Sequence, residues 1–347
     1  MAALQIKRLM AQDAALARRW DSFVLACPNA TFFHRAGWLR MVEQIFGHQA
    51  YFLYAERDGC IEAVLPLAQV KSMLFGHSLV ALPFAVYGGV ASLNDEAAAL
   101  LEQEAQAIAQ RLGAEHLEFR NVTARHADWP KQDLYVTFRK EILPEEEANM
   151  LAIPRKARAS VRKGIKNNLV GHIDSNVDRF FALYADNTHR HGTPAMPKRY
   201  FAALLDEFGA DAEVLTVTDA DGRPLSSVLS FYFRDEVLPY YAGDDEAARD
   251  LAGNDFKYWE LMRRACARGI KVFDYGRSKV GTGSYAYKKN WGFEPMPLHY
   301  EYCLYKREAV PQNNPNNPKY QLLIKTWRRL PLGFVNWLGP FIVRNLG

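Results

Sequence analysis

The chain has 347 residues, of which 49% are hydrophobic and 24% are charged, and its formal net charge is +4. This composition excludes a disordered chain, a collagen-like repeat and a polytopic membrane protein, and the length predicts about two domains. The charge is too small to require nucleic acid, and we expect no DNA as a partner. The four cysteines have no Cys-x-x-Cys spacing and the N-terminus has no apolar signal region, so we expect reduced thiols and a cytoplasmic protein.

A series of features occurs twice along the chain in the same order. Each copy has a hairpin with an Asp-Gly turn, a tyrosine-glycine segment, a helix that ends before a glycine, and a further strand. This order predicts an α/β (α+β) fold of two similar domains on mixed sheets. We place the domains at 1–150 and 151–308, with a linker and a basic tail over 309–347. The matched features are the turns at 58–59 and 221–222, the tyrosine-glycine segments at 86–89 and 240–243, the helices at 95–112 and 255–268, and the strands at 116–120 and 271–275.

A basic helix is predicted at the start of the second domain, over residues 154–166. This segment carries six cations and no acid. Arg155, Arg158, Arg162 and Lys166 fall on one face, and Ala157, Val161 and Ile165 fall on the opposite, apolar face. Like charges this close repel one another, which favours a polyanionic partner such as a lipid headgroup, a nucleotide diphosphate or tRNA. The alternative is a solvated helix face.

The densest motif spans residues 273–295. A strand ends at Asp274, a loop with three glycines follows, and aromatic and cationic residues come next. Asp274 is a candidate base or amine-orienting group, and Lys288 or Lys289 a candidate donor to an oxyanion. If this segment is extended, neighbouring side chains point in opposite directions, and one of the two lysines faces solvent. Arg277 and Lys279 are candidate phosphate or carboxylate ligands, while Trp291 and Phe293 are expected in the core or a pocket wall.

The motif 273–295, together with residues 254–262, the N-terminal FFHRAGWLRMVEQIFGH, the central LPFAVYGG and the basic helix, resembles the FemAB-related family. The resemblance is closer to the branch associated with PEP-CTERM/exosortase systems, and it covers nearly the whole chain. It implies two tandem GNAT-like (acyl-CoA N-acyltransferase-like) domains. Better-known members transfer amino acids from aminoacyl-tRNA to a cell-wall precursor, whereas this branch is linked with exopolysaccharide and protein-sorting gene clusters.

Two departures from relatives affect the expected acyl donor. CoA-dependent GNAT enzymes cradle the pyrophosphate in a glycine-rich loop at a helix start. The matching residues 248–255 have one glycine and two acids, which fit a diphosphate poorly. The chain also lacks the long helical arm that some FemAB proteins insert, so tRNA contact through such an arm is not expected. Tyr241 and Lys257 lie beside this loop as candidate cleft residues, and His189 and His191 lack the spacing of a metal site.

The C-terminal tail has two interpretations. A polar linker rich in Pro and Asn precedes it. The first interpretation is a helix over 320–327 that docks on the protein's own core, and the second is a helix that lies in a membrane interface. Its helical spacing places Tyr320, Leu323, Ile324 and Trp327 on one face, and Lys325, Arg328 and Arg329 on the other.

Together these patterns predict an acyl- or aminoacyltransferase that acylates an amine, with a saccharide or a lipid-linked envelope or exopolysaccharide precursor as acceptor. The donor is aminoacyl-tRNA or acyl-CoA, and peripheral contact with the inner membrane through residues 317–347 is a further expectation. The alternatives are a CoA-dependent N-acetyltransferase of a small amine and a noncatalytic membrane-surface adaptor. The candidate catalytic residues are Asp274, Lys288, Lys289 and Tyr285, and the candidate binding residues are Tyr87, Arg155, Arg158, Arg162, Tyr241, Lys257, Arg277, Ser278 and Trp291.

Overall fold

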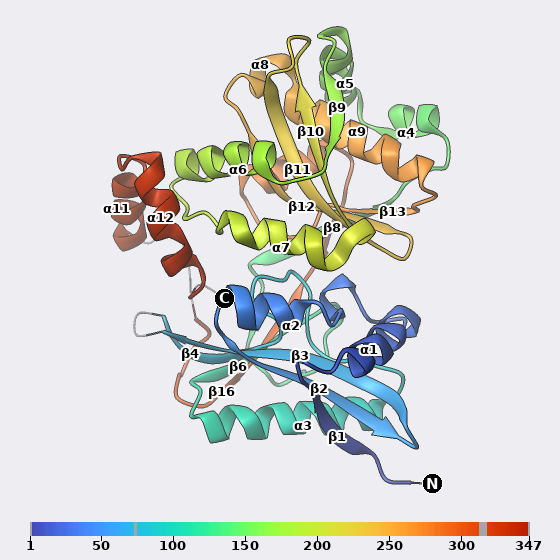
Figure 1. Cartoon of the computed structure of the whole chain (residues 1–347), viewed down its shortest axis with the longest axis vertical. Coiled ribbons are helices and arrows are strands. Elements are labelled where there is room, and N and C mark those ends of the chain that lie inside the picture. Colours follow the sequence, from blue (N-terminus) through green and yellow to red (C-terminus); the bar gives the residue numbers. More distant parts are fainter. Residues whose placement is uncertain (1, 73–74, 312–317, 346–347) are drawn as a thin grey trace. The chain divides into compact units, whose positions relative to one another are not determined.

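A computed structural model describes residues 2–72, 75–311 and 318–345, with side chains omitted for 318–322. The chain forms two compact units (Figure 1). The first unit comprises Met1–Asp133, Leu298–Gln312 and Arg344–Gly347, and the second comprises Leu134–Pro297 and Asn313–Val343. Each unit contains an eight-stranded mixed sheet with helices packed on it. The predicted α/β fold class is therefore confirmed.

The sheet of the first unit has the order β1-β2-β3-β4-β6-β16-β7, with β5 paired to β3. Among the strands that the structure describes in this sheet, β4 and β6 are the one pair that runs parallel. Helix α3 packs on this sheet; it begins after Asn94, whose side chain accepts from the Ala97 amide, and ends at Gly113, where φ is +66°. These local signals explain why the sequence predicts its limits correctly. The strands are β1 (Gln5–Leu9), β2 (Gln49–Arg57), β3 (Cys60–Ser72), β4 (Gly76–Val80), β5 (Ala91–Ser92), β6 (His116–Asn121), β7 (Lys131–Gln132) and β16 (His299–Leu304), and the helices are α1 (Ala14–Ala26), η1 (Phe32–His34), α2 (Trp38–Arg40), η2 (Met41–Ile45) and α3 (Asp95–Leu112).

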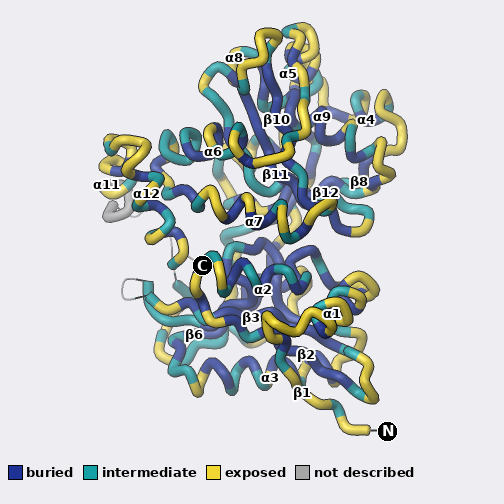
Figure 2. Tube along the Cα trace, in the orientation of Figure 1, coloured by how far each residue is buried: buried dark blue, intermediate teal, exposed yellow. Residues whose placement is uncertain are grey.

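The sheet of the second unit has the order β14-β8-β13-β12-β11-β10-β9, with β15 paired to β8. Its central strands β10 and β11 are buried along their length (Figure 2). The strands are β8 (Tyr135–Glu141), β9 (Val170–Asp174), β10 (Ala212–Thr218), β11 (Pro224–Phe233), β12 (Glu236–Asp244), β13 (Val272–Asp274), β14 (Ser278–Lys279) and β15 (Pro295–Pro297). The helices are α4 (Glu146–Ala152), α5 (Arg155–Lys166), α6 (Asp178–His191), α7 (Lys198–Phe208), η3 (Gly209–Asp211), α8 (Ala248–Leu251), α9 (Gly253–Ala267), α10 (Gly283–Asn290), α11 (Pro318–Trp327) and α12 (Leu332–Val343).

The helices of the second unit divide between the two faces of the sheet. On β11, Phe231 contacts Phe208 of α7, with ring centroids 6.1 Å apart. The next residue, Tyr232, points to the other face, where it belongs to the same core cluster as Trp259 and Met262 of α9. Helices α6 and α7 thus cover one face, and α9 covers the other with α5 packed against it.

The compact units differ from the domain limits expected from composition. Strand β8 lies before residue 150 but pairs with β13, β14 and β15 of the second unit. Strand β16 lies before residue 308 but pairs with β6 and β7 of the first unit. Strand partners are set by long-range register, which the local composition around residue 150 does not reveal. Most of the expected Pro- and Asn-rich linker, PQNNPNNPK at 311–319, falls on residues 312–317, which lie outside the described residues.

Among the described residues, no helix combines the length and the hydropathy that a membrane crossing requires.

Candidate active site in the second unit

The central sheet of the second unit opens between β12 and β13. These parallel strands pair only at Glu236 with Val272 and at Val237 with Phe273, although β12 continues to Asp244. The register between β11 and β12 shifts between Leu229 and Ser230, where Tyr240 is an extra residue on β12. Within the described part of the chain, no strand pairs with the rest of β12 on its β13 side. The segment that follows β13 carries the densest sequence motif, so this opening is the candidate site.

Asp274 ends β13 and is fully buried. Its Oδ1 accepts from the Gly276 amide at 2.7 Å and from the Thr137 hydroxyl at 3.3 Å. Its Oδ2 lies 3.5 Å from the Arg139 guanidinium, which also pairs with Glu236. Burial and the nearby Asp274 charge raise the pKa of Glu236. The carboxylate of Asp274 is therefore held by side chains of β8 and by the turn that follows Asp274.

The lysine segment is helical, so the expectation that it is extended is wrong. Helix α10 begins after Thr282, whose hydroxyl accepts from the Tyr285 amide at 3.4 Å. Lys288 is buried and Lys289 is exposed, so Lys288 is the lysine of the pair that faces inward. The helix has no strong apolar periodicity, and only its N-cap signals its start.

The ammonium group of Lys288 binds the loop after β13. Its Nζ donates to the main-chain oxygens of Tyr275 at 2.7 Å, Gly276 at 3.0 Å and Arg277 at 3.1 Å. Burial lowers its pKa to about 8, although the Asp274 charge acts in the opposite direction. Lys288 thus fixes the conformation of the loop that carries Arg277 and Ser278.

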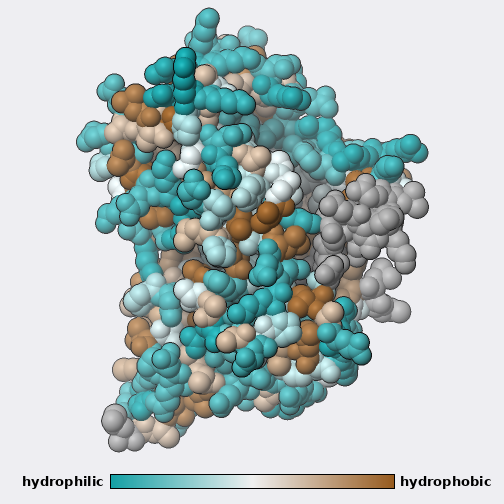
Figure 3. Space-filling model, turned by 180° about the vertical axis from the view of Figure 1, so that it is seen from behind, coloured by the Kyte–Doolittle hydropathy of each residue, from teal (hydrophilic) through white to brown (hydrophobic). Residues whose placement is uncertain are grey.

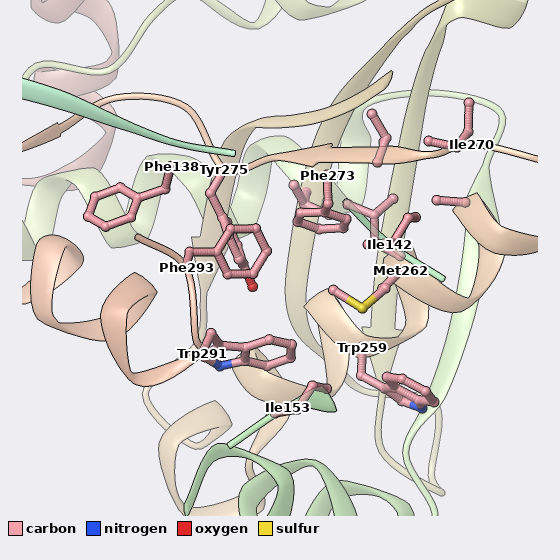
Figure 4. Packing of buried hydrophobic residues seen from close by; sticks show 14 of the residues in the cluster. Phe138, Ile142, Ile153, Trp259, Met262, Ile270, Phe273, Tyr275, Trp291 and Phe293 are labelled. Carbon is pink, nitrogen blue, oxygen red and sulfur yellow. The ribbon is translucent and has the colours of Figure 1, made fainter. Parts of the chain in front are cut away.

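An aromatic group lies beside this loop, built around Asp255 at the start of α9. Asp255 Oδ1 accepts from the Trp291 indole at 2.9 Å and from the Tyr287 hydroxyl at 3.3 Å. Burial raises the pKa of Asp255, and these two hydrogen bonds oppose the shift. Tyr275 packs between Phe293 and Trp291, with ring centroids 4.7 and 6.2 Å away, and its hydroxyl points toward Trp291 (Figure 4). The sequence motif indicated the aromatic residues but not Asp255.

Lys257 and Tyr241 do not lie free beside an open loop. Lys257 is fully buried, and its Nζ lies 2.8 Å from Asp244 Oδ1 at the end of β12. Tyr241 is directed to the α6 and α7 face, where its hydroxyl lies 3.0 Å from that of Tyr200. Burial raises the pKa of both tyrosines well above the usual value. Lys257 therefore ties α9 to β12, and Tyr241 belongs to an aromatic cluster away from Asp274.

The cations of α5 have no acidic partners among the described residues. Arg155 and Arg162 are exposed, and Arg158 donates to the Leu151 carbonyl at 3.2 Å. The surface around α5 and α8 is hydrophilic (Figure 3). The buried stripe consists of Ala157, Val161 and Gly164, whereas Ile165 is 47% exposed, so its expected place on the packed face is wrong.

Helix α5 packs beside the candidate site. A Cβ on Gly164 would lie 2.7 Å from Phe256 Cβ on α9, so the two helices approach closely there. At the other end, Pro154 lies 3.1 Å from the Cβ position of Gly292, immediately after α10. Helix α5 thus runs along α9, and its N-terminal end lies near the residues that follow α10.

The remaining candidate residues have separate environments. Tyr285 packs edge-on against Phe138, with centroids 5.5 Å apart. Arg277 is exposed and lies over the Tyr135 ring, 4.6 Å from its centroid. The buried Ser278 hydroxyl has no hydrogen-bond partner among the described residues. Tyr87 is buried in the first unit, next to Phe33. No group of three or more His, Cys, Asp or Glu is placed to hold a metal ion in the described ranges.

Comparisons with known proteins agree with this architecture. Residues 155–289 match the acetyltransferase (GNAT) domain family. The structure resembles the crystal structure of FemX, with a TM-score of 0.64 and 15% identity, over 92% of this chain and 100% of that one. It also resembles a tandem GNAT protein from the clavulanic acid biosynthesis pathway, with a TM-score of 0.55 and 13% identity, over 90% of this chain and 100% of that one. The fold is therefore a tandem of GNAT-like domains.

One curated relative has an assigned activity. UDP-N-acetylmuramoylpentapeptide-lysine N(6)-alanyltransferase of Weissella viridescens is 23% identical over 103 residues, which is 29% of this chain. The matched region spans 31% of the length of that relative. Over part of its length the chain is thus similar to acyltransferases, through this alanyltransferase and through the GNAT match.

Proposed function

We propose that the second unit transfers an aminoacyl group from aminoacyl-tRNA to an amine of a saccharide or lipid-linked envelope precursor. The observation that carries the proposal is helix α5, whose six cations have no acidic partner among the described residues and whose preceding Pro154 lies against Gly292, after α10. Charges of this density attract phosphate-bearing molecules, and both tRNA and nucleotide-linked or lipid-linked precursors carry phosphates. The alanyltransferase similarity supports aminoacyl transfer in particular.

The chemistry requires an acceptor amine, a base and a donor to the developing oxyanion. The amine nitrogen attacks the ester carbonyl of the donor, the carbon–nitrogen bond forms, and the ester carbon–oxygen bond breaks. The amine proton passes to Asp274 or a water, and a proton ends on the hydroxyl that leaves. We assign the oxyanion donor to Lys288, which is the inward-facing lysine of the pair. All three N–H groups of its ammonium donate to main-chain carbonyls. The oxyanion would therefore accept the hydrogen bond that the carbonyl of the exposed Arg277 accepts in this structure.

Coenzyme A fits the start of α9 poorly. Asp244 ends β12, the segment between β12 and α9 carries Asp245, Glu246 and Asp250, and Asp255 follows in the first turn of α9. The nearby Lys257 is already paired with Asp244. Acids in these places repel a pyrophosphate, so we derive no step through coenzyme A.

The experiment compares donors on the purified full-length protein. Radiolabelled alanyl-tRNA and radiolabelled acetyl-CoA are supplied with UDP-N-acetylmuramoyl-pentapeptide as a probe acceptor, or with a polar lipid extract. We expect transfer from alanyl-tRNA to at least one acceptor and none from acetyl-CoA. Faster transfer from acetyl-CoA would overturn the choice of donor, and no transfer from either with tight vesicle binding would favour an adaptor.

A charge-reversal pair tests the role of α5. Arg155→Glu combined with Arg162→Glu should weaken tRNA binding at least tenfold and reduce its dependence on salt. The matched control, Arg18→Glu combined with Lys131→Glu, reverses two exposed cations of the first unit and should leave binding within twofold. Equal losses in both variants would contradict a specific role for α5.

A further inference from the structure

Helix α12 is attached to the second unit by one narrow face. Val335, Gly339 and Val343 are buried. A Cβ on Gly339 would lie 3.1 Å from the main-chain oxygen of Ala195, so the helix approaches the segment after α6 closely. Glycine permits this close approach, because a Cβ at this distance would require the neighbouring backbone to shift slightly.

The opposite face of α12 exposes a stripe of aromatic rings. Phe334 is 45% exposed, Trp337 is 64% exposed and Phe341 is 53% exposed. Their spacing of three and four residues places them on one side of the helix. The centroid of the Trp337 ring lies 5.8 Å from that of Phe334 and 5.9 Å from that of Phe341, so the rings form a continuous ladder. Leu323 on the preceding helix α11 is a further apolar side chain with 64% exposure.

The charged residues that α11, α12 and their flanking residues carry are all positive. Residues 318–347 include Lys319, Lys325, Arg328, Arg329 and Arg344, and they contain no Asp or Glu. Arg328 is exposed and is fixed by a hydrogen bond of 3.2 Å to the His191 carbonyl. Lys325 and Arg329 are exposed as well, and α11 and α12 lie together at the edge of the second unit beside α6 (Figures 1 and 2).

We propose that α11 and α12 dock this protein on the surface of an anionic phospholipid bilayer. The Phe334–Trp337–Phe341 stripe enters the boundary between headgroups and acyl chains, where aromatic rings are favoured. The surrounding cations contact lipid phosphates, because Lys and Arg near an anionic surface are attracted within a Debye length. Neither helix needs to cross the bilayer, because Val335, Gly339 and Val343 keep α12 against the second unit. The charges that α11 and α12 themselves carry are of one sign, which favours an anionic lipid surface over a protein partner with charges of both signs.

The test measures partition of the full-length protein onto vesicles by sedimentation. Vesicles of phosphatidylcholine alone are compared with vesicles that contain phosphatidylglycerol. We expect at least tenfold stronger binding to the anionic vesicles, and a further decrease when salt is raised. Phe334→Ser with Trp337→Ser should reduce this binding at least tenfold, and so should Lys325→Glu with Arg329→Glu.

The matched control replaces two exposed leucines elsewhere. Leu93 and Leu151 are each 59% exposed, and Leu93→Ser with Leu151→Ser should leave vesicle binding within twofold. All replaced side chains are exposed, and thermal unfolding verifies that each variant is folded. The proposal is overturned if the wild type does not bind anionic vesicles, if the control loses as much binding as the aromatic variant, or if light scattering shows a dimer that the aromatic variant abolishes. None of these results depends on the transfer reaction.

Discussion

Replacing Lys288 by methionine tests whether this lysine holds the loop after β13 in place. Its ammonium group donates to the carbonyls of Tyr275, Gly276 and Arg277. Tyr275 and Gly276 are buried, so methionine leaves two carbonyls without a partner, at about 1–3 kcal/mol each. Methionine keeps most of the apolar volume of the lysine side chain. We therefore expect the free energy of unfolding to fall by about 2–6 kcal/mol.

The burial of Lys288 also determines how the loss of stability caused by Lys288→Met changes with pH. The pKa of the ammonium is lowered from 10.5 to about 8 in the folded protein. Between these values the unfolded chain holds a proton that the folded chain has released, so stability rises with pH. This contribution is complete above about pH 10.5 and is lost as the pH falls through about 8. At about 1.4 kcal/mol for each pKa unit, the loss of unfolding free energy caused by Lys288→Met should be about 3.5 kcal/mol larger at the alkaline end of the range than at the acidic end.

The assay is urea unfolding, followed by tryptophan fluorescence between about pH 7 and pH 10, combined with hydrogen exchange of residues 275–282. Lys289→Met is the matched control, because Lys289 is adjacent but exposed. We expect it to change stability by less than about 0.5 kcal/mol and to leave exchange unaltered. Equal stability of the two variants, or a difference that does not change with pH, would refute the role assigned to Lys288.

Two further predictions concern other buried contacts. Burial alone would lower the pKa of His126, but hydrogen bonds to Glu102 and Glu301 raise it to about 9. The contribution of His126 to the free energy of unfolding is therefore complete below about pH 6.5 and is lost as the pH rises through 9. His126→Gln should therefore cost about 1–2 kcal/mol at pH 6, after allowance for solvent screening, and less at pH 9.5 in urea unfolding. Gly243→Ala should cost about 1–3 kcal/mol, because the new Cβ would lie 2.4 Å from the Tyr184 backbone. Gly333→Ala, which meets nothing within 4 Å, should leave the melting temperature unchanged or raise it.

Features set by nearby residues could be predicted from the sequence. Helix α3 was predicted with its observed limits because Asn94 and Gly113 cap it locally. The repeated order of elements predicted two sheets, which the structure contains. The exchange of β8 and β16 between the units could not be predicted, since strand register depends on partners more than 100 residues away along the chain.

The candidate site shows the same division. The sequence motif identified Asp274 and Lys288, but their partners depend on tertiary structure. Thr137 and Arg139 come from β8, which was expected in the other domain. The helical conformation of α10, rather than an extended one, directs Lys288 inward and Lys289 outward. Asp255 was missed because an acid in the first turn of a helix is common for purely local reasons.

The distribution of charge in the second unit separates binding from catalysis. Asp274, Lys257 and Lys288 are buried, and each is already held by a main-chain or side-chain partner. Groups held in this way keep a fixed geometry, which favours transition-state interactions. The α5 cations are exposed and have no acidic partner among the described residues, so they remain available to a phosphate-bearing ligand. Charge reversal on α5 should therefore raise KM in a salt-dependent manner, whereas substitutions of Asp274 or Lys288 should lower kcat at every salt concentration.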